Sequence, residues 1–417
     1  MREGLSVEEA QASILRVTSK LGSEMVATEG ANARVLAESI EASRCQPPSD
    51  CSAMDGYAVR HEDLRDASPE NPISLPVVFE VAAGGQPERP LAPGEAARIF
   101  TGAPLPAGAD TVVKQEDTRP ASGGVEIWVS PVLREHVRDA GEDFDFGDRL
   151  IESGTVLGPP HFGVLASIGR SVVSVHQRPT VAILSGGNEL VEPDRPAAAG
   201  QIVSSNSYTL AAQCREVGAR PSYLGIASDR PAEIEARLRD GLRADVIVSS
   251  AGVSVGDHDH VRSVLEKLGC KLDFWGVRMK PGFPMVFGVI ESSGTLVFGL
   301  PGNPVSAYVT FEQFVRPALR KMLGHRALFR PVVRAELTQE LKKRAGRLHF
   351  VRVTLERRGG ILYATPTANQ GSGVLTSLIR GDGLAIFKEH EQRLEIGSEV
   401  DVQLIEPGFF DQIERGF

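Results

Sequence analysis

The chain has 417 residues and a formal net charge of −9 at pH 7. This length is too great for one hydrophobic core and predicts roughly two to four domains. The acidic balance argues against a nucleic-acid partner, because phosphate backbones are bound by basic surfaces. No apolar stretch is long enough to span a membrane, so no membrane partner is expected. The absence of a G-x-x-x-x-G-K-[ST] motif excludes a Walker-type NTPase.

The first residues, MREGLSVEEAQ, lack the apolar core of an export signal. The four cysteines are scattered, with no C-x-x-C pair, so neither a disulfide framework nor a structural zinc site is expected. Both observations predict a cytoplasmic protein.

The N-terminal region, residues 1–178, is expected to combine two connecting segments with an inserted β lobe. Ser6 and Glu9 form a capping box, which predicts a helix that continues to about Leu21. The segments 1–46 and 146–178 connect the lobe, and the apolar run from Val156 to Val175 is expected to return to this helix. Between them, residues 47–145 are rich in proline and glycine and predict strands at Leu75–Val81, Ala97–Phe100 and Val125–Val129.

Two turns in this lobe carry polar side chains of interest. Asp55 precedes a glycine in the stretch SAMDGYA, where its carboxylate can project from the turn. Thr101 opens the stiff turn TGAPLPAG. On their spacing alone, ordinary turn chemistry is the favoured interpretation of both residues.

Residues 179–325 alternate apolar strands with helices, which predicts a doubly wound, mainly parallel α/β domain. In such a sheet every strand-to-helix turn lies at the carboxyl edge. Four acidic turn residues and one loop are therefore expected to line one crevice: Glu189, Asp229, Asp257, Asp259 and Gly302–Ser306. This arrangement favours a site for a metal ion and a phosphate.

The stretch SSAGVSVGDHDHV, residues 249–261, is central to that crevice. It joins a buried strand to a helix through small residues, so backbone N–H groups and a helix N-terminus can bind an oxyanion. The candidate anion-binding residues are Ser250, Gly252, Ser254 and Gly256. Asp257 and Asp259 can hold a divalent cation, although an aspartate at this place is often only a helix cap. His258 and His260 are expected to be solvated or capping.

Three further features lie nearer the C-terminus. Lys280 is followed by a rigid Pro-Gly-Phe-Pro turn, and Asn303 and Pro304 fit the N-cap and first position of a helix. Residues 326–417 become β-rich again, with a hairpin through Gly359-Gly360, and predict a small C-terminal barrel. Within it, Arg352 and the turn NQGSG, residues 369–373, can supply an oxyanion fork and N–H donors.

Six motifs occur in order along the chain: SAMDGYA, RIFTGAPLPAGADTVV, SSAGVSVGDHD, MKPG, GLPGNPVSA and NQGSG. Together they closely resemble the molybdopterin molybdenumtransferases, the MoeA and gephyrin E-domain family, from about Leu5 to Ile405. The resemblance implies a molybdenum insertase of multidomain α/β plus β fold. Its substrates would be adenylylated molybdopterin and molybdate, and it would use Mg²⁺ or another divalent ion to cleave the phosphoanhydride and release AMP. It also implies a homodimer whose cleft is shared between subunits, and molybdopterin adenylyltransferase as an upstream partner.

The resemblance also implies roles for individual residues. Asp55 and Thr101 would face the crevice across the dimer interface, and Glu189, Asp229 and Asp259 match the acidic residues of the family's cleft. We hypothesise that Asp55, Asp229 and Asp259, with Asp257 in the same loop, serve the metal and the pyrophosphate. Molybdate would be bound by Lys280, Arg352 and Ser372. The nucleotide-side loop would consist of Pro301, Gly302, Asn303, Pro304 and Ser306.

The chain departs from the family pattern at three positions. The family usually has TGDEL, MKPGKP and I-x-D-S-N where this chain has Asn188, Phe283 and Ser204. Phe283 matters most, because it cannot replace the charge of a lysine implicated in oxyanion binding. Either Arg278 compensates or the chain is a divergent paralogue. A non-catalytic molybdopterin-binding or scaffold protein and an insertase that prefers tungstate are the alternative interpretations.

Overall fold

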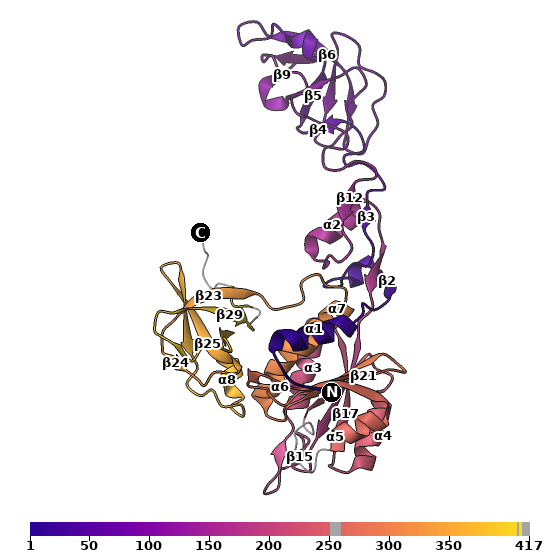
Figure 1. Ribbon diagram of the computed structural model, residues 1–417. Coiled ribbons are helices and arrows are strands. Elements are labelled where there is room, and N and C mark those ends of the chain that lie inside the picture. Colours follow the sequence, from indigo (N-terminus) through magenta and orange to yellow (C-terminus); the bar gives the residue numbers. More distant parts are fainter. Residues whose placement is uncertain (251–259, 407, 411–417) are drawn as a thin grey trace. The chain divides into compact units, whose positions relative to one another are not determined.

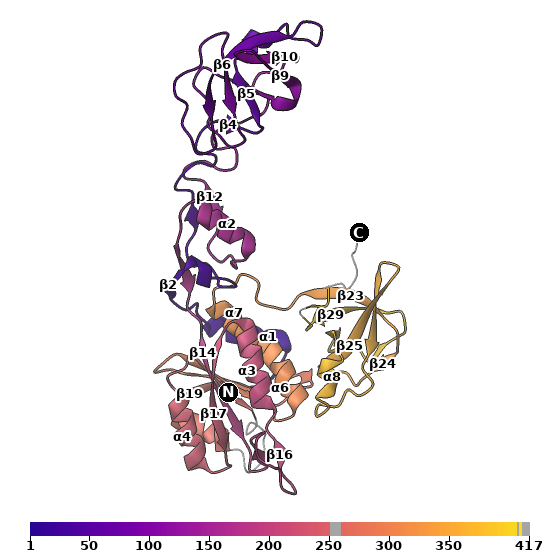
Figure 2. The same ribbon diagram turned by 180° about the vertical axis from the view of Figure 1, so that it is seen from behind.

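The computed structural model describes residues 1–250, 260–406 and 408–410. The chain forms two compact units, one made of residues 38–153 and 158–172 and the other of residues 1–37, 154–157 and 173 onward. Figures 1 and 2 trace the elements of both units from opposite sides. None of the described helices is both long enough and apolar enough to cross a lipid bilayer.

The unit around residues 38–172 contains a six-stranded sheet in the order β8-β5-β7-β6-β10-β9. The longest strand, β6, alternates buried and more exposed side chains, with Leu75, Phe79 and Val81 in the core. Gly56 opens β5 beside β8, and a Cβ there would lie 1.9 Å from the carbonyl oxygen of Val113, so only glycine fits. The strands are β5 Gly56–Val59, β6 Ile73–Val81, β7 Ala96–Ile99, β8 Thr111–Lys114, β9 Thr118–Ala121 and β10 Gly124–Ile127.

Short elements carry the chain into and out of this sheet. Two-stranded pairs form between β3 and β12 and between β4 and β11, and a helix, α2, follows. Their bounds are β3 Ile40–Glu41, β12 Arg149–Ile151, β4 Cys51–Ser52, β11 Val137–Arg138 and α2 Pro159–Ser167. The three strands predicted in the β lobe are confirmed, with ends that differ by one or two residues.

The larger unit contains a seven-stranded sheet in the order β1-β19-β21-β22-β18-β14-β17. Strands β22, β18, β14 and β17 are parallel, whereas β21 runs antiparallel to both of its neighbours. The bounds are β1 Arg2–Leu5, β14 Thr180–Gly186, β17 Arg220–Ala227, β18 Val246–Ser250, β19 Cys270–Val277, β21 Val286–Ile290 and β22 Thr295–Leu300. The predicted mainly parallel α/β domain is confirmed.

Helices cover both faces of this sheet, because successive strand residues point to opposite sides. Val181 and Ile183 pack with residues of α1, α3, α6 and α7, whereas Ala182 and Leu184 pack with residues of α4 and α5. The helices are α1 Val7–Val17, α3 Asn206–Val217, α4 Pro231–Gly241, α5 His260–Lys267, α6 Pro304–Thr310 and α7 Arg316–Met322. The two groups of helices lie on opposite sides of the strands in Figure 1.

The N-terminal segment differs from its prediction in three ways. The capping box of Ser6 and Glu9 is present, but α1 ends at Val17 rather than near Leu21. The residues before it form the edge strand β1, which is too short and polar to show a strand pattern. The segment that was expected to return to this helix contains the strand β13, Val172–His176. This strand pairs with the strand β2, Ser23–Ala27, which follows the helix in the sequence.

The C-terminal part of the larger unit contains a closed five-stranded barrel. Pairing runs from β25 through β26, β23, β29 and β27 and back to β25. The predicted hairpin is confirmed, because Arg358 pairs with Ile361 across Gly359 and Gly360, which have φ of 55° and 86°. The strands are β23 Val332–Leu337, β25 Leu348–Arg358, β26 Ile361–Pro366, β27 Gly383–Phe387 and β29 Glu399–Leu404.

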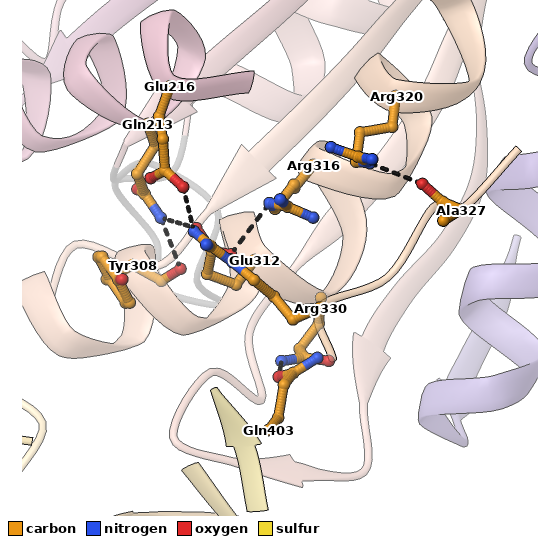
Figure 3. Close-up of polar contacts among 10 residues, drawn as sticks. Gln213, Glu216, Tyr308, Glu312, Arg316, Arg320, Ala327, Arg330 and Gln403 are labelled. Carbon is orange, nitrogen blue, oxygen red and sulfur yellow. Dashed lines mark hydrogen bonds and ion pairs between the residues drawn. The ribbon is translucent and has the colours of Figure 1, made fainter. Parts of the chain in front are cut away.

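A buried polar network lies where the sheet domain meets the chain that leads into the barrel (Figure 3). Glu312, on the π-helical turn Phe311–Val315, has a side chain that is 1% exposed. Its carboxylate accepts hydrogen bonds from Arg330 at 2.8 Å and from Gln213 at 2.7 Å, and Arg316 lies 3.5 Å away. The network therefore joins α3, the π-helical turn that follows α6, α7 and the segment that precedes β23.

Candidate functional site

The turns at the carboxyl ends of β14 and β17 are tied together by two polar side chains. The backbone N–H of Asp229 donates to the amide oxygen of Asn188 at 3.1 Å. The backbone N–H of Asn188 lies 3.4 Å from the Asp229 carboxylate. Asn188 replaces a carboxylate of the family pattern, and here its neutral amide avoids placing a second negative charge beside Asp229. Asparagine at position 188 is therefore compatible with the position of Asp229 at the predicted carboxyl edge of the sheet.

A cavity of about 620 Å³ lies at the same edge, and we call it the sheet-edge cavity. Its lining includes Glu189, Ser250, Ser204, Asn206 and Pro301–Pro304. Glu189 is exposed and lies directly over Gly187, where φ is +137° and a Cβ would come 2.5 Å from the Glu189 carboxylate. The structure thus brings Glu189, Ser250 and the Pro301–Pro304 loop together, as the sequence predicted.

Hydrogen bonds from neighbouring loops hold the Pro301–Pro304 loop in place. The side-chain amide of Asn206 donates to the carbonyl of Gly302 at 2.8 Å. The N–H of Val305 donates to the carbonyl of Ser372 at 3.0 Å. Asn303 and Pro304 occupy the N-cap and first positions of α6 as predicted, but the Asn303 side chain makes no capping hydrogen bond. This loop is therefore positioned by α3 and by the barrel.

Ser204, the second departure from the family pattern, is a buried hydroxyl in a short chain of serines. Its Oγ lies 3.3 Å from the Oγ of Ser185 and 3.2 Å from the Oγ of Ser207. Only 2% of the residue is exposed. A carboxylate could not join these hydroxyls without a desolvation cost, so the serine suits its surroundings.

Lys280 belongs to the short strand β20, Met279–Lys280, which pairs with β25 of the barrel. It is exposed and lines a cavity of about 560 Å³, which we call the lysine cavity. The other polar residues of this lining are Asn303, Ser306, Arg347, Gln370 and Ser372. The lysine cavity shares Pro284, Pro301 and Asn303 with the sheet-edge cavity, so the two adjoin.

A third cavity, of about 600 Å³, lies on the barrel side and is called the barrel cavity. It shares Lys280, Pro281, Arg347 and Gln370 with the lysine cavity. Arg352 lines the barrel cavity, whereas Ser372 lines the lysine cavity. The three residues predicted to bind molybdate are thus divided between two adjoining cavities, with Lys280 common to both.

Arg352 is 1% exposed, and much of its hydrogen-bonding capacity is used within the barrel. Nε donates to Ser377 at 3.1 Å, and Nη2 donates to the carbonyls of Asn369 and Gly371 at 3.2 and 3.1 Å. Burial lowers the pKa of the guanidinium to about 10. No described carboxylate pairs with it, so it retains an uncompensated positive charge beside the barrel cavity. The predicted oxyanion fork is therefore reduced to Nη1.

Arg278 does not compensate for Phe283. Its Nε donates to the carboxylate of Glu389 at 2.7 Å, and its Nη1 donates to the carbonyl of Gly4. The bond to Glu389 raises the pKa of Arg278 above its usual value. Arg278 lines neither the lysine cavity nor the barrel cavity. The structure therefore gives no support to compensation by Arg278, whose carboxylate partner Glu389 is distant in the sequence. Arg347, which the sequence analysis missed, is the cation beside Phe283.

Asp55 and Thr101 lie in the other unit and contact each other. The backbone N–H and the hydroxyl of Thr101 each donate to Oδ1 of Asp55 at 2.8 Å. These bonds lower the pKa of Asp55 below its usual value. The sequence placed both residues in turns but gave no sign that they pair.

Several predicted site residues lie outside the described part of the chain: Gly252, Ser254, Gly256, Asp257 and Asp259. His258 also lies outside it, whereas His260 begins α5. Among the described residues, no three histidine, cysteine, aspartate or glutamate side chains gather closely enough to hold a metal ion. Asp229 and Glu189 by themselves therefore do not fit a divalent cation.

Comparisons with known proteins cover almost the whole chain. Residues 5–169 match the MoeA N-terminal region (domains I and II), residues 182–321 a probable molybdopterin binding domain, and residues 334–405 the MoeA C-terminal region (domain IV). The chain belongs to the MoeA family.

Relatives in this family are named molybdopterin molybdenumtransferase. The protein from Nostoc sp. is 38% identical over 389 residues, which cover 92% of this chain and 89% of that protein. The protein from Bacillus subtilis is 35% identical over 409 residues, which cover 97% and 95%. A crystal structure of the molybdopterin biosynthesis MoeA protein from Pyrococcus horikoshii matches with a TM-score of 0.85 at 34% identity, over 96% of this chain and 99% of that one. A crystal structure of a molybdopterin biosynthesis MoeA protein from Pyrococcus horikoshii OT3 gives a TM-score of 0.83 at 30% identity, over 96% of this chain and 100% of that one.

Membership of the MoeA family makes this chain a transferase, as the names of its relatives state. The predicted family and fold class are both confirmed.

Proposed function

We propose that this transferase inserts molybdate into adenylylated molybdopterin and releases AMP. The observation that carries the proposal is the charge arrangement of the three adjoining cavities. Lys280 and Arg347 are the charged residues of the lysine cavity, and Arg352 adds to them in the barrel cavity. No carboxylate is found among the described residues that line either one. Glu189 lies at the other end, in the sheet-edge cavity. A row of cavities with one cationic end suits a substrate pair whose charges are all negative.

The proposed division of labour follows from this arrangement. Lys280, Arg352 and Ser372 bind molybdate, because cationic and hydroxyl groups stabilise a dianion. The Pro301–Pro304 loop and Ser250 bind the nucleotide side of the substrate. As an oxygen atom from water bonds to the adenylyl phosphorus, the bridging P–O bond breaks, the bridging oxygen stays on the molybdopterin phosphate and AMP leaves. If the oxygen comes from molybdate instead, its Mo–O bond also breaks, so that the oxygen leaves with AMP. Asp229, Asp257, Asp259 and Asp55 are assigned to a divalent ion, such as Mg²⁺, that would neutralise the phosphoanhydride.

We further propose a homodimer, in which Asp55 and Thr101 of one subunit complete the cavities of the other. A carboxylate of lowered pKa, held by two hydrogen bonds in a separate unit, suits a group that is presented to a partner. Molybdopterin adenylyltransferase is the expected source of the substrate. Sedimentation or light scattering of the purified protein measures the oligomeric state.

The decisive experiment mixes the purified protein with adenylylated molybdopterin and Mg²⁺ and follows AMP with and without molybdate. Release that depends on molybdate is the expected result. Tight nucleotide binding without release would identify a paralogue that has lost the reaction. Replacement of molybdate by tungstate in the same assay measures the preference between the two oxyanions, which are nearly equal in size and charge.

A further inference from the structure

Arg347 lies over the aromatic ring of Phe283. The guanidinium carbon is 4.4 Å from the ring centroid, which is the geometry of a cation–π contact. The ring itself is anchored, because Trp275 meets it edge-on with centroids 5.5 Å apart. Gly276, where φ is +76°, lies behind it, and a Cβ there would come 3.3 Å from Cζ of Phe283. Phe283 thus forms a fixed platform that favours one position of the Arg347 guanidinium.

No described carboxylate pairs with Arg347, and in this it resembles Lys280 and Arg352 but differs from Arg278 and Lys342. Arg278 binds Glu389 at 2.7 Å, and Lys342 lies 2.6 Å from Glu340. Lys343 donates to the carbonyl of Glu389 at 3.1 Å. The contact recorded for Arg347 is the face of an uncharged ring, which orients the guanidinium without neutralising it. Its charge therefore remains available to an anion.

The position of Arg347 places this charge where the lysine cavity and the barrel cavity adjoin. With Lys280, it lines both the lysine cavity and the barrel cavity. The pKa of His349 in the barrel cavity is lowered to about 4, first by burial and then by the charges of Lys280, Lys343 and Arg347. Burial is the larger cause, and the additional lowering by three neighbouring cations is consistent with a positive potential in this cavity.

We propose that Arg347 binds the tetrahedral oxyanion together with Lys280, and that Phe283 positions it for this role. The inference rests on the proposed function and deepens it. It also explains how the chain can dispense with a lysine at position 283, since the charge comes from Arg347 directly before β25 and the aromatic ring determines where it lies. Arg347 would touch the anion, whereas Phe283 acts through Arg347.

The test measures molybdate binding to the full-length protein by calorimetry, in parallel with molybdate-dependent AMP release. Arg347→Gln should raise the molybdate Kd about 10-fold or more, as expected for the loss of one charge-assisted contact. The matched control is Arg357→Gln, which removes an exposed arginine of β25 that lines none of the three cavities. This control should leave the Kd unchanged. Thermal unfolding of both variants should match the wild type, because both side chains are exposed.

Substitutions at position 283 separate positioning from packing. Phe283→Trp keeps an aromatic face and should retain binding, whereas Phe283→Leu should raise the Kd by about 2- to 5-fold through loss of the cation–π contact. The double variant Phe283→Lys/Arg347→Gln should regain most of the affinity lost in Arg347→Gln. A merely structural role for Arg347 would give no such rescue.

The outcomes distinguish this inference from the proposed function. Wild-type binding and turnover with an unchanged Kd in Arg347→Gln would overturn the role of Arg347 and leave the insertase intact. A wild-type protein that neither binds molybdate nor releases AMP would overturn both. If Arg347→Gln lost affinity and Phe283→Lys did not restore it, the idea that Arg347 replaces a lysine at position 283 would be contradicted.

Discussion

One oxygen of Asp55 accepts two hydrogen bonds from Thr101, one from its backbone and one from its hydroxyl, both at 2.8 Å. Each bond favours the charged carboxylate, so the pKa of Asp55 lies below its usual value. The other oxygen makes no hydrogen bond to a described residue. The pair therefore presents an ionised carboxylate with one free oxygen, and Thr101 acts through Asp55.

Thr101→Val tests this relationship by removing the hydroxyl while the backbone N–H stays. The pKa of Asp55 should rise, so that the acid limb of the pH profile of AMP release moves to higher pH. Thr101→Ser keeps the hydroxyl and should leave the limb where it is. An unmoved limb in the valine variant would show that Asp55 does not titrate in the reaction.

The shared cleft of the proposed dimer can be tested by complementation. Asp55→Asn and Lys280→Ala should each be nearly inactive alone. If each cleft combines residues of two subunits, random mixing should restore about a quarter of wild-type activity, since half of the dimers carry one intact cleft. Clefts formed within single chains would leave the mixture as inactive as its components.

Asp259→Asn tests the metal assignment in the segment after β18. The variant should abolish AMP release and leave the dimer intact, because a neutral amide is a poorer ligand for Mg²⁺ than a carboxylate. Removal of divalent ions with a chelator should abolish release in the wild type, and added Mg²⁺ should restore it. Normal turnover of Asp259→Asn would contradict the assignment.

Removal of the buried carboxylate of Glu312 should destabilise the larger unit (Figure 3). Glu312→Gln leaves Arg330 and Arg316 without their buried carboxylate, and should lower the free energy of unfolding by about 3–5 kcal/mol. Urea denaturation measures this change. Glu399→Gln removes an exposed partner of Arg334 and should cost at most about 1 kcal/mol. Equal effects of the two substitutions would show that burial does not strengthen the network.

Local sequence chemistry predicted much of the fold. The Ser6–Glu9 capping box, the Gly359-Gly360 hairpin turn and the strand-to-helix turns all depend on residues close together in the chain. The sequence also predicted that Glu189 and the Pro301–Pro304 loop lie at one sheet edge, because the direction of parallel strands determines where their turns lie. In the structure both line the sheet-edge cavity.

The parts that could not be predicted depend on contacts between distant segments. The stacking of Arg347 on Phe283 joins the segment that leads into β25 of the barrel to a loop of the sheet domain, and no local pattern indicates it. Arg278 is the cation nearer to Phe283 in the sequence, but it forms an ion pair with Glu389. The pairing of Asp55 with Thr101 likewise requires two turns to meet. The edge strand β1 lacked a pattern because it has four residues and partners β19 alone.

Because β20 pairs with β25, the position of Lys280 depends on the barrel as well as on the sheet domain. Its backbone is aligned by a strand of the barrel, although its place in the sequence is between two strands of the central sheet. A fragment that ends before the barrel would keep Lys280 but lose the strand that holds it, together with Arg347 and Arg352. The anion site therefore depends on residues of both domains. An exchange between relatives would preserve it only if the sheet domain and the barrel were transferred together.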